Sequence, residues 1–202
     1  MKLFFAPGAC SRASHIALRE AGMTFDLEAV NLGSKKTTAG ADFWAVNTKG
    51  AVPALQTDSG DVLTEGTAIM QFIADKNPAS NLAPAFGTME RYHLIEWLNY
   101  IAAELHKTVG ALWNPAITAD QKTATFAMMT NKFNWVEKNL AGKNYLMGDT
   151  FTIADGYLFT IVGWCAHFNF DLAAWPNLQA YMARVAARPA VAAAIAAEKT
   201  AN

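Results

Sequence analysis

The fold is decided at the start of the chain by the stretch KLFFAPGACS, residues 2–11. Residues 3–5 are a predicted buried strand, and Pro7-Gly8 end it with turn chemistry. Cys10 then stands at the mouth of a helix predicted over residues 11–21. A thiol there meets the positive end of the helix dipole and unpaired backbone N–H groups, which both favour the thiolate. We therefore expect Cys10 to be reactive; the alternative is a small buried apolar residue.

Composition indicates a compact globular protein. The chain has 202 residues, of which 52% are hydrophobic and 16% charged, enough to bury a core in one large or two small domains. No apolar run approaches the roughly 18–20 residues of a membrane span, and no signal peptide is recognisable. We therefore expect a cytoplasmic protein with no membrane partner.

Charge and cysteine content exclude several further classes. The net charge is −1, from 16 basic and 17 acidic residues, and the longest basic run is Lys35-Lys36. So short a run cannot follow a phosphate backbone, so we expect no nucleic-acid partner. Cys10 and Cys165 form no CxxC pair, and no disulfide is expected between them in a reducing cytosol. No HExxH or paired His/Cys spacing indicates a metal site.

Strand and helix patterns alternate through the first part of the chain. After the first strand and helix, residues 25–30 alternate with the period of a strand, and residues 43–44 belong to a short helical segment. Residues 52–57 and 61–64 flank a turn as a β-hairpin, and a helix starts after Thr64. The order β-α-β-α-β-β-α predicts a mixed sheet, because the strand–helix–strand unit gives a parallel pair and the hairpin an antiparallel one.

A Pro-rich connection separates this α/β part from an all-helical part. From Thr88 onward strand signals vanish and apolar residues recur at helical spacing, as in Tyr92, Ile95, Leu98, Ile101 and Leu105. We predict an α/β domain over residues 1–77, a linker over residues 78–87 and an all-helical domain over residues 88–202.

Several short motifs, in this order and spacing, resemble the cytosolic glutathione transferases, and among them the bacterial beta class. They are Pro7-Gly8-Ala9-Cys10-Ser11 with Ser14-His15-Ile16, Val52-Pro53-Ala54-Leu55, Leu63-Thr64-Glu65-Gly66, Glu96-Trp97-Leu98-Asn99 and Glu104-Leu105-His106-Lys107. The resemblance covers essentially the whole chain. It implies a thioredoxin-like N-terminal domain, a C-terminal helical bundle, glutathione as co-substrate without a tightly bound cofactor, and a homodimer.

The resemblance places a glutathione site on the first domain. It implies a cis bond between Val52 and Pro53, which would turn the Val52 backbone toward the cysteinyl part of glutathione; an ordinary turn proline is the alternative. Glu65 and Gly66 begin a helix, where backbone N–H groups would bind the α-carboxylate of glutathione and Glu65 its ammonium, unless Glu65 only caps the helix. Many family members have serine at the position of Gly66, so only its backbone is expected to bind. Lys35 would meet the glycyl carboxylate, or remain a solvated surface group.

The resemblance also assigns residues of the helical domain. It gives His106 a position facing the cysteine sulfur, where His106 or Lys107 would stabilise an anionic sulfur. A histidine on such a helix, taken alone, more often makes a structural hydrogen bond. Asn99 and Glu104 would reach the glutathione of a partner subunit. The neighbouring Ala103 and Leu105 complete the expected glutathione contacts.

Other residues are expected to be structural. His15 and His93 are predicted on helix surfaces. Thr152 and Asp155 have the spacing of a capping box, so Asp155 is interpreted as a helix cap and not as a catalytic acid.

Two enzyme chemistries are open at Cys10. In conjugation, hydrogen bonds from Ser11, Cys10 or backbone N–H groups would favour the glutathione thiolate, which attacks a hydrophobic electrophile. In thiol–disulfide exchange, Cys10 would form a mixed disulfide with glutathione, and a second glutathione would resolve it because Ala13 replaces the second cysteine of a CxxC motif. A carrier of hydrophobic ligands or antibiotics with little turnover is the alternative, and it needs neither Cys10 nor His106.

Overall fold

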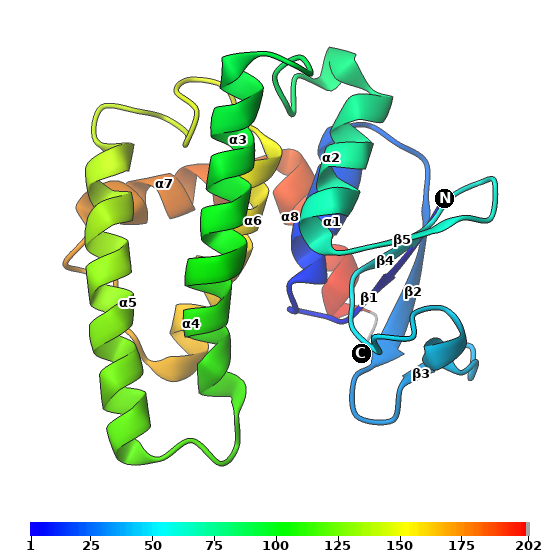
Figure 1. Cartoon of the computed structure of the whole chain (residues 1–202), viewed down its shortest axis with the longest axis horizontal. Coiled ribbons are helices and arrows are strands. Elements are labelled where there is room, and N and C mark those ends of the chain that lie inside the picture. The colour runs from blue at the N-terminus through cyan, green and yellow to red at the C-terminus, as the bar shows by residue number, and fades with distance from the viewer. Residues whose placement is uncertain (201–202) are drawn as a thin grey trace. The chain divides into compact units, whose positions relative to one another are not determined.

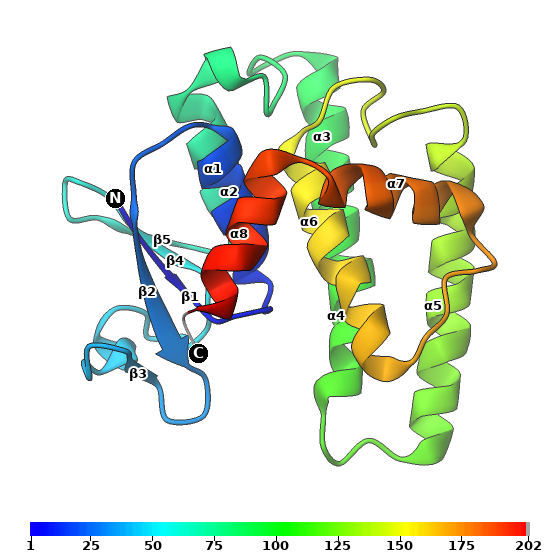
Figure 2. The same cartoon turned by 180° about the vertical axis from the view of Figure 1, so that it is seen from behind.

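A computed structural model describes residues 1–200 of the chain, which divide into two units. One unit consists of Met1–Ala83 and the described residues from Arg188 onward, and the other of Pro84–Ala187. Figures 1 and 2 show the elements of both units from opposite sides. Each unit is described on its own.

The first unit is built on a five-stranded sheet of order β3-β2-β1-β4-β5 (Figure 1). The strands are β1 (Lys2–Phe5), β2 (Asp26–Asn31), β3 (Lys36–Thr37), β4 (Ala54–Gln56) and β5 (Val62–Thr64). β1 pairs parallel with β2 and antiparallel with β4, and β4 pairs antiparallel with β5. This is the predicted mixed sheet. Sequence analysis missed only β3, because two residues are too few to show a period.

Both faces of the sheet are covered, so the strands are apolar on both sides. Helices α1 (Ser11–Glu20) and α2 (Gly66–Lys76) pack together, and Leu3, Ile16, Leu55 and Ile69 are fully buried. Phe4, whose side chain points opposite to that of Leu3, joins a second cluster with Phe43, which lies in the short 3₁₀ helix Phe43–Ala45.

The last helix, α8 (Pro189–Lys199), belongs to the first unit, where it packs against α1 (Figure 2). The guanidinium of Arg188, just before α8, donates to both carboxylate oxygens of Glu20 at 2.6 and 2.8 Å. The helical domain was expected to extend to residue 202, whereas the helical unit ends at Ala187. Its apolar pattern is real, but the pattern of a helix does not say which neighbour buries it.

The second unit is all helical. Its helices are α3 (Met89–Tyr100), α4 (Lys107–Gly110), α5 (Ala119–Leu140), α6 (Ile153–Gly163) and α7 (Pro176–Ala186), and the π-helical stretch Ile101–His106 joins α3 to α4. All residues of α6 from Ile153 to Val162 are buried, as is expected of a central helix that is apolar on every side.

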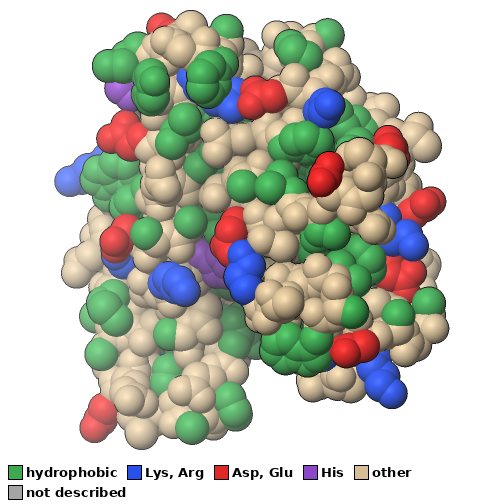
Figure 3. All heavy atoms as spheres, turned by 45° about the vertical axis from the view of Figure 1, so that its right-hand side comes forward, with side chains coloured by type: hydrophobic (Ala, Val, Ile, Leu, Met, Phe, Trp, Pro, Cys, Tyr) green, Lys and Arg blue, Asp and Glu red, His purple; other side chains and the backbone are tan. Residues whose placement is uncertain are grey.

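The face drawn in Figure 3 is mixed in charge, and the described residues include no membrane-spanning helix. Positive and negative side chains are interspersed over the face drawn in Figure 3, without a broad patch of either sign. Among residues 1–200, no helix combines the length and the apolar character needed to cross a lipid bilayer.

Candidate active site

Cys10 is held at the start of α1 by the turn that follows β1. Gly8, with φ of 73°, takes the left-handed conformation that this turn requires. Cys10 is the residue that caps α1, is half-buried, and directs its Sγ at the carbonyl oxygen of Val52, 3.3 Å away. The strand–turn–helix arrangement predicted from residues 2–11 therefore places a thiol against the loop before β4.

The Cys10 thiol is not activated by this environment. Burial raises the pKa of Cys10 to about 11, the backbone N–H groups of Cys10 and Ser11 lower it by less, and the negative charge of Glu65 raises it again. The expectation of a thiolate at the helix start is therefore wrong here. The dipole and the N–H donors act in the predicted direction, but the loss of solvation outweighs them.

Ser11 is used within the chain. Its side chain is fully buried, and its Oγ accepts from the N–H of Ala6 at 3.1 Å and donates to the carbonyl oxygen of Ala6 at 3.2 Å. The predicted catalytic role of Ser11, donation to the glutathione sulfur, does not fit this geometry. Ser11 instead ties the end of β1 to the start of α1 and so fixes the turn that carries Cys10.

The loop before β4 brings the other predicted residues of this unit together. The bond between Val52 and Pro53 is cis, as the resemblance implies. Pro53 lies beside Gly66, because a Cβ placed on Gly66 would be 3.7 Å from Cγ of Pro53. At the other end of the loop, the carbonyl oxygen of Gly50 accepts from Nζ of Lys35 at 2.7 Å.

Lys35 is therefore a fixed group. It is half-buried, its backbone has a φ of 56°, and its Nζ also lies 5.8 Å from the ring centroid of Trp44. The alternative of a freely solvated lysine does not describe it. The structure thus presents a cation next to the loop that carries Val52 and Pro53.

Glu65 begins α2 in a conformation that residues other than glycine rarely adopt, with φ of 69°. Its side chain is 69% exposed and forms an ion pair of 2.5 Å with Nζ of Lys49. Its side chain makes no hydrogen bond that caps α2. The N–H groups in the first turn of α2, starting at Gly66, keep the positive character that binds anions. Sequence analysis missed Lys49, because a lysine in a loop carries no pattern.

The helical unit holds His106 by a short hydrogen bond. Nδ1 of His106 lies 2.7 Å from the hydroxyl of Tyr157, and the imidazole packs edge-on against Trp164 with the ring centroids 5.1 Å apart. Burial lowers the pKa of His106, and the positive charge of Lys107 lowers it further. His106 is therefore a neutral imidazole near pH 7, where it can donate a hydrogen bond but supplies no positive charge.

The other residues of this unit that were predicted to contact glutathione are exposed, except Leu105. Exposed side chains belong to Asn99, Ala103, Glu104 and Lys107. Asn99 donates to the carbonyl oxygen of Ile95 at 3.0 Å, and Glu104 pairs with Lys132. Leu105 is fully buried in the core, so its side chain is not available to glutathione and the predicted contact is left to its backbone. On a helix, one position in three or four faces inward, and Leu105 has the spacing of the buried Ile101 and Val109.

A buried ionic network lies behind the turn that carries Cys10. Glu198 of α8, 1% exposed, accepts from the N–H of Gly8 at 3.0 Å, from Nε of Arg12 at 2.8 Å and from Nδ1 of His15 at 3.1 Å. The expectation that His15 lies on a helix surface is wrong, because it is fully buried and also accepts from Arg19 at 2.8 Å. Sequence analysis also missed Glu198. The sequence did contain a signal for it, because Glu198 has the helical spacing of Val191 and Ala194, the other buried residues of the Ala-rich helix α8.

Thr152 and Asp155 form a capping box at the start of α6. The carboxylate of Asp155 accepts from the N–H and the hydroxyl of Thr152 at 2.8 and 2.9 Å, from the N–H of Leu146 at 2.9 Å and from the hydroxyl of Tyr181 at 3.1 Å. These hydrogen bonds all join the Asp155 carboxylate to buried groups of the same unit, so Asp155 has a structural role, as predicted.

Comparison with known protein families assigns both units to the same family. Residues 8–76 match the glutathione S-transferase N-terminal domain and residues 100–189 the glutathione S-transferase C-terminal domain. Among characterised sequences, glutathione S-transferase GstA of Escherichia coli O157:H7 is 46% identical over 198 residues, which cover 98% of each chain.

Solved structures of glutathione S-transferases are similar to this chain over nearly its whole length. The ternary complex of BphK, a bacterial glutathione S-transferase, is 50% identical with a TM-score of 0.97, covering 98% of this chain and all of the other. The beta class glutathione S-transferase of Sphingomonas chungbukensis is 47% identical with a TM-score of 0.95, covering 98% of each chain. With the thioredoxin-like sheet, the cis Val52–Pro53 bond and the cysteine at α1 already in place, the chain belongs to the glutathione S-transferase family, in its bacterial beta class.

Proposed function

We propose that the chain conjugates glutathione to hydrophobic electrophiles and that Cys10 also exchanges disulfides with glutathione. Membership of the family gives the transferase activity and glutathione as the co-substrate, without a tightly bound cofactor. The observation that supports the cysteine step is the position of the Cys10 sulfur, half-buried at the start of α1 and 3.3 Å from the Val52 carbonyl oxygen. A carrier function has no observation in its favour.

The proposed exchange has two balanced steps. Cys10, in the small fraction that has lost its proton to solvent, attacks the glutathionyl sulfur of a mixed disulfide, forms a Cys10–glutathione disulfide and releases the other thiol as its thiolate, which takes up a proton. The thiolate of a second glutathione attacks the same glutathionyl sulfur, forms oxidised glutathione and releases the Cys10 thiolate. The partner thiol of the mixed disulfide is reduced and one glutathione is oxidised, joining the glutathionyl group of the mixed disulfide as oxidised glutathione, so no other reductant is needed. Ala13 stands where a second cysteine would otherwise resolve the intermediate.

We propose that the first unit binds glutathione along the loop that contains Val52 and Pro53. The backbone of Val52 pairs with the cysteinyl part, the N–H groups that begin at Gly66 bind the α-carboxylate, and Glu65 accepts from the ammonium. Lys35 binds the glycyl carboxylate. The contacts that join Cys10 to Val52, Pro53 to Gly66 and Lys35 to Gly50 support this arrangement, since they bring all these groups to one loop.

The helical unit supplies the other proposed contacts. We assign glutathione binding to Ala103, His106 and Lys107, with His106 as a hydrogen-bond donor because its imidazole is neutral. In the proposed homodimer, Asn99 and Glu104 reach the glutathione of the partner subunit; their exposure leaves them available for this. We place the enzyme in the cytoplasm.

The test compares the wild type with Cys10→Ala on two substrates, each with glutathione: 1-chloro-2,4-dinitrobenzene for conjugation and the mixed disulfide of glutathione and 2-mercaptoethanol for exchange. We expect exchange to be lost and conjugation to remain. Cys165→Ala is the matched control, because Cys165 is the other cysteine and belongs to the helical unit. Exchange at the wild-type rate in Cys10→Ala would overturn the cysteine step and leave the transferase activity standing.

A further inference from the structure

Trp44 lies against the loop along which glutathione is proposed to bind. It is 46% exposed and belongs to the 3₁₀ helix Phe43–Ala45. Its ring rests on Gly50, because a Cβ placed on Gly50 would be 2.5 Å from both Cη2 and Cζ3 of the ring. Gly50 is buried and has a φ of 60°. This position therefore requires glycine twice, for its backbone conformation and for the close approach of the ring.

The same ring borders the ammonium of Lys35. Nζ of Lys35 lies 5.8 Å from the ring centroid of Trp44 and donates to the carbonyl oxygen of Gly50 at 2.7 Å. Trp44 and Lys35 thus meet at one residue of the loop, the first by ring contact and the second by a hydrogen bond. An ammonium has three donors, so the bond to Gly50 leaves others for a ligand carboxylate.

The backbone fixes Trp44 relative to Lys35. The N–H of Trp44 donates to Oδ1 of Asp42 at 3.0 Å, and this bond caps the 3₁₀ helix. The N–H of Phe43 donates to the carbonyl oxygen of Lys35 at 2.8 Å. The side chain of Phe43 is fully buried, in a cluster that includes Val52. An anchored turn therefore places the exposed ring of Trp44.

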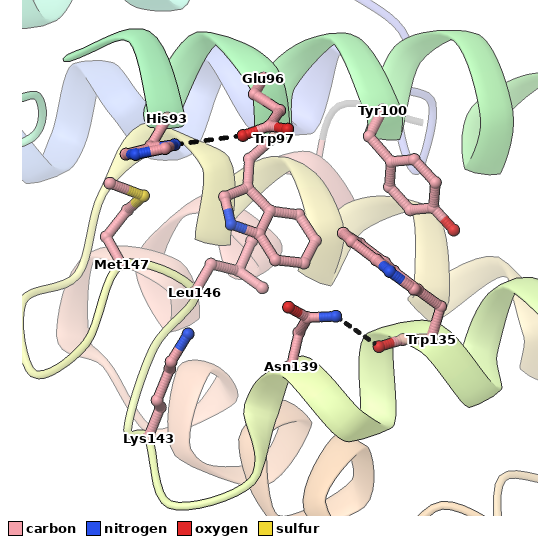
Figure 4. A pocket seen from close by; sticks show the side chains of 9 residues that line it. All are labelled: His93, Glu96, Trp97, Tyr100, Trp135, Asn139, Lys143, Leu146 and Met147. Atoms are coloured by element: carbon pink, nitrogen blue, oxygen red, sulfur yellow. Dashed lines mark hydrogen bonds and ion pairs between the residues drawn. The ribbon is translucent and has the colours of Figure 1, made fainter. Parts of the chain in front are cut away.

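Trp44 differs in its contacts from Trp135, a tryptophan of the helical unit that is exposed to a similar extent, 43%. The ring of Trp135 packs on those of Trp97 and Tyr100, with centroids 4.9 and 4.5 Å apart (Figure 4). The ring of Trp44 instead packs on the backbone of a glycine and faces a lysine ammonium, which an aromatic face attracts. Its contacts therefore act on the position of these two groups.

We propose that Trp44 is a positioning residue for glutathione, whose ring holds the ammonium of Lys35 where Lys35 meets the glycyl carboxylate. The inference rests on the proposed contact between Lys35 and that carboxylate. A restrained lysine loses less side-chain entropy on binding than a free one, and the ring face stabilises its charge. Trp44 thus favours ligands with a free glycyl carboxylate, and it acts through Lys35.

The experiment measures binding of two unreactive ligands to the full chain by calorimetry: S-methylglutathione and its ethyl ester at the glycyl carboxylate. The ester lacks the charge that Lys35 is proposed to bind, so the ratio of the two affinities reports on this contact. Trp44→Leu still covers Gly50 but has no ring. We expect it to reduce the preference for the acid about two- to fivefold, the scale of one cation–π contact, and to leave the affinity for the ester unchanged.

Two further variants serve as controls. Trp44→Phe keeps an aromatic ring on Gly50 and should retain most of the preference for the acid. Lys36→Gln, at the exposed neighbour of Lys35, should keep the wild-type preference. Equal losses of affinity for acid and ester in Trp44→Leu would show that the ring only maintains the fold of the unit, and would overturn the positioning role.

Lys35→Gln separates this inference from the proposed site. Loss of the preference in Lys35→Gln, together with a wild-type preference in Trp44→Leu, would overturn the role of Trp44 and leave the glycyl contact standing. A wild-type preference in Lys35→Gln would overturn the glycyl contact and this inference with it. The S-methyl ligands do not react at sulfur, so none of these outcomes depends on conjugation or on exchange at Cys10.

Discussion

The imidazole of His106 and the hydroxyl of Tyr157 are joined by a hydrogen bond with Nδ1 and Oη 2.7 Å apart. A phenol is a good donor, and the pKa of His106 is lowered by burial and by Lys107, so we assign the hydroxyl as donor and Nδ1 as acceptor. The ring proton then resides on Nε2. Tyr157 therefore determines which nitrogen of His106 can donate a hydrogen bond to a ligand.

Replacing Tyr157 by phenylalanine should raise the pKa of His106 toward its ordinary value. The hydroxyl bond stabilises the neutral ring, and its loss leaves Nδ1 free to take up a proton. NMR titration of the imidazole measures this shift. Tyr92→Phe is the control, because Tyr92 is an exposed tyrosine on α3. If both variants titrate like the wild type, the hydroxyl does not donate to His106.

Cys10 should be alkylated slowly at neutral pH, and about tenfold faster for each pH unit between 7 and 9, because burial raises its pKa to about 11. Glu65→Gln should speed the reaction at pH 8 roughly twofold, since it removes a screened negative charge that raises this pKa. Iodoacetamide labelling followed by peptide mass spectrometry measures Cys10 apart from Cys165. Glu90→Gln, an exposed substitution on α3, is the control. An alkylation rate of Cys10 that no longer rises with pH above 7 would show that Cys10 is already a thiolate at pH 7 and would contradict the raised pKa.

The course of the chain was predictable where a local pattern reports directly on structure. The turn at Pro7-Gly8, the hairpin of β4 and β5, and the helical period after Thr88 are all local signals, and the structure has these elements. The motifs around Cys10, Val52 and Glu65 led to the family by resemblance, and the family is confirmed.

The errors concern burial, which depends on contacts between distant segments. His15 was expected on a surface because its partner, Glu198, comes 183 residues later in the chain. Ser11 stands inside a recognisable motif, but its side chain faces the core. The pKa of Cys10 was expected to fall because a helix start is visible in the sequence, whereas the desolvation that raises the pKa is not.

Glu198→Gln should destabilise the first unit by about 3–5 kcal/mol at pH 7, the scale for removing one partner of a buried ion pair. Burial by itself raises the pKa of Glu198, but the hydrogen bonds of His15 and Gly8 and the charge of Arg12 bring it below its ordinary value. A lowered pKa means that this stabilisation is present above the unfolded value of 4.5 and is lost as the pH falls through the folded value. Urea unfolding with Lys199→Gln as the exposed control on α8 measures the difference. Equal stability of Glu198→Gln and the control at pH 7 would show that the network contributes nothing.

Asp155 should give the opposite pH dependence. Burial raises its pKa from 3.8 to about 6, although the hydrogen bonds of Leu146, Thr152 and Tyr181 act against this. Between these two values the folded chain binds more protons than the unfolded chain, so the contribution of Asp155 to the free energy of unfolding decreases as the pH rises. The decrease from pH 4 to pH 7 should be about 2 kcal/mol.

The measurement is the difference in the free energy of unfolding between the wild type and Asp155→Asn, taken by urea titration across this range. Asparagine cannot titrate, so the other carboxylates cancel in the difference. We expect the advantage of the wild type to be larger at pH 4 than at pH 7. Asp149→Asn, at an exposed aspartate in the loop before α6, is the matched control. A wild-type advantage that grows with pH would show that the four hydrogen bonds to the carboxylate outweigh its desolvation, and that Asp155 stays ionised throughout.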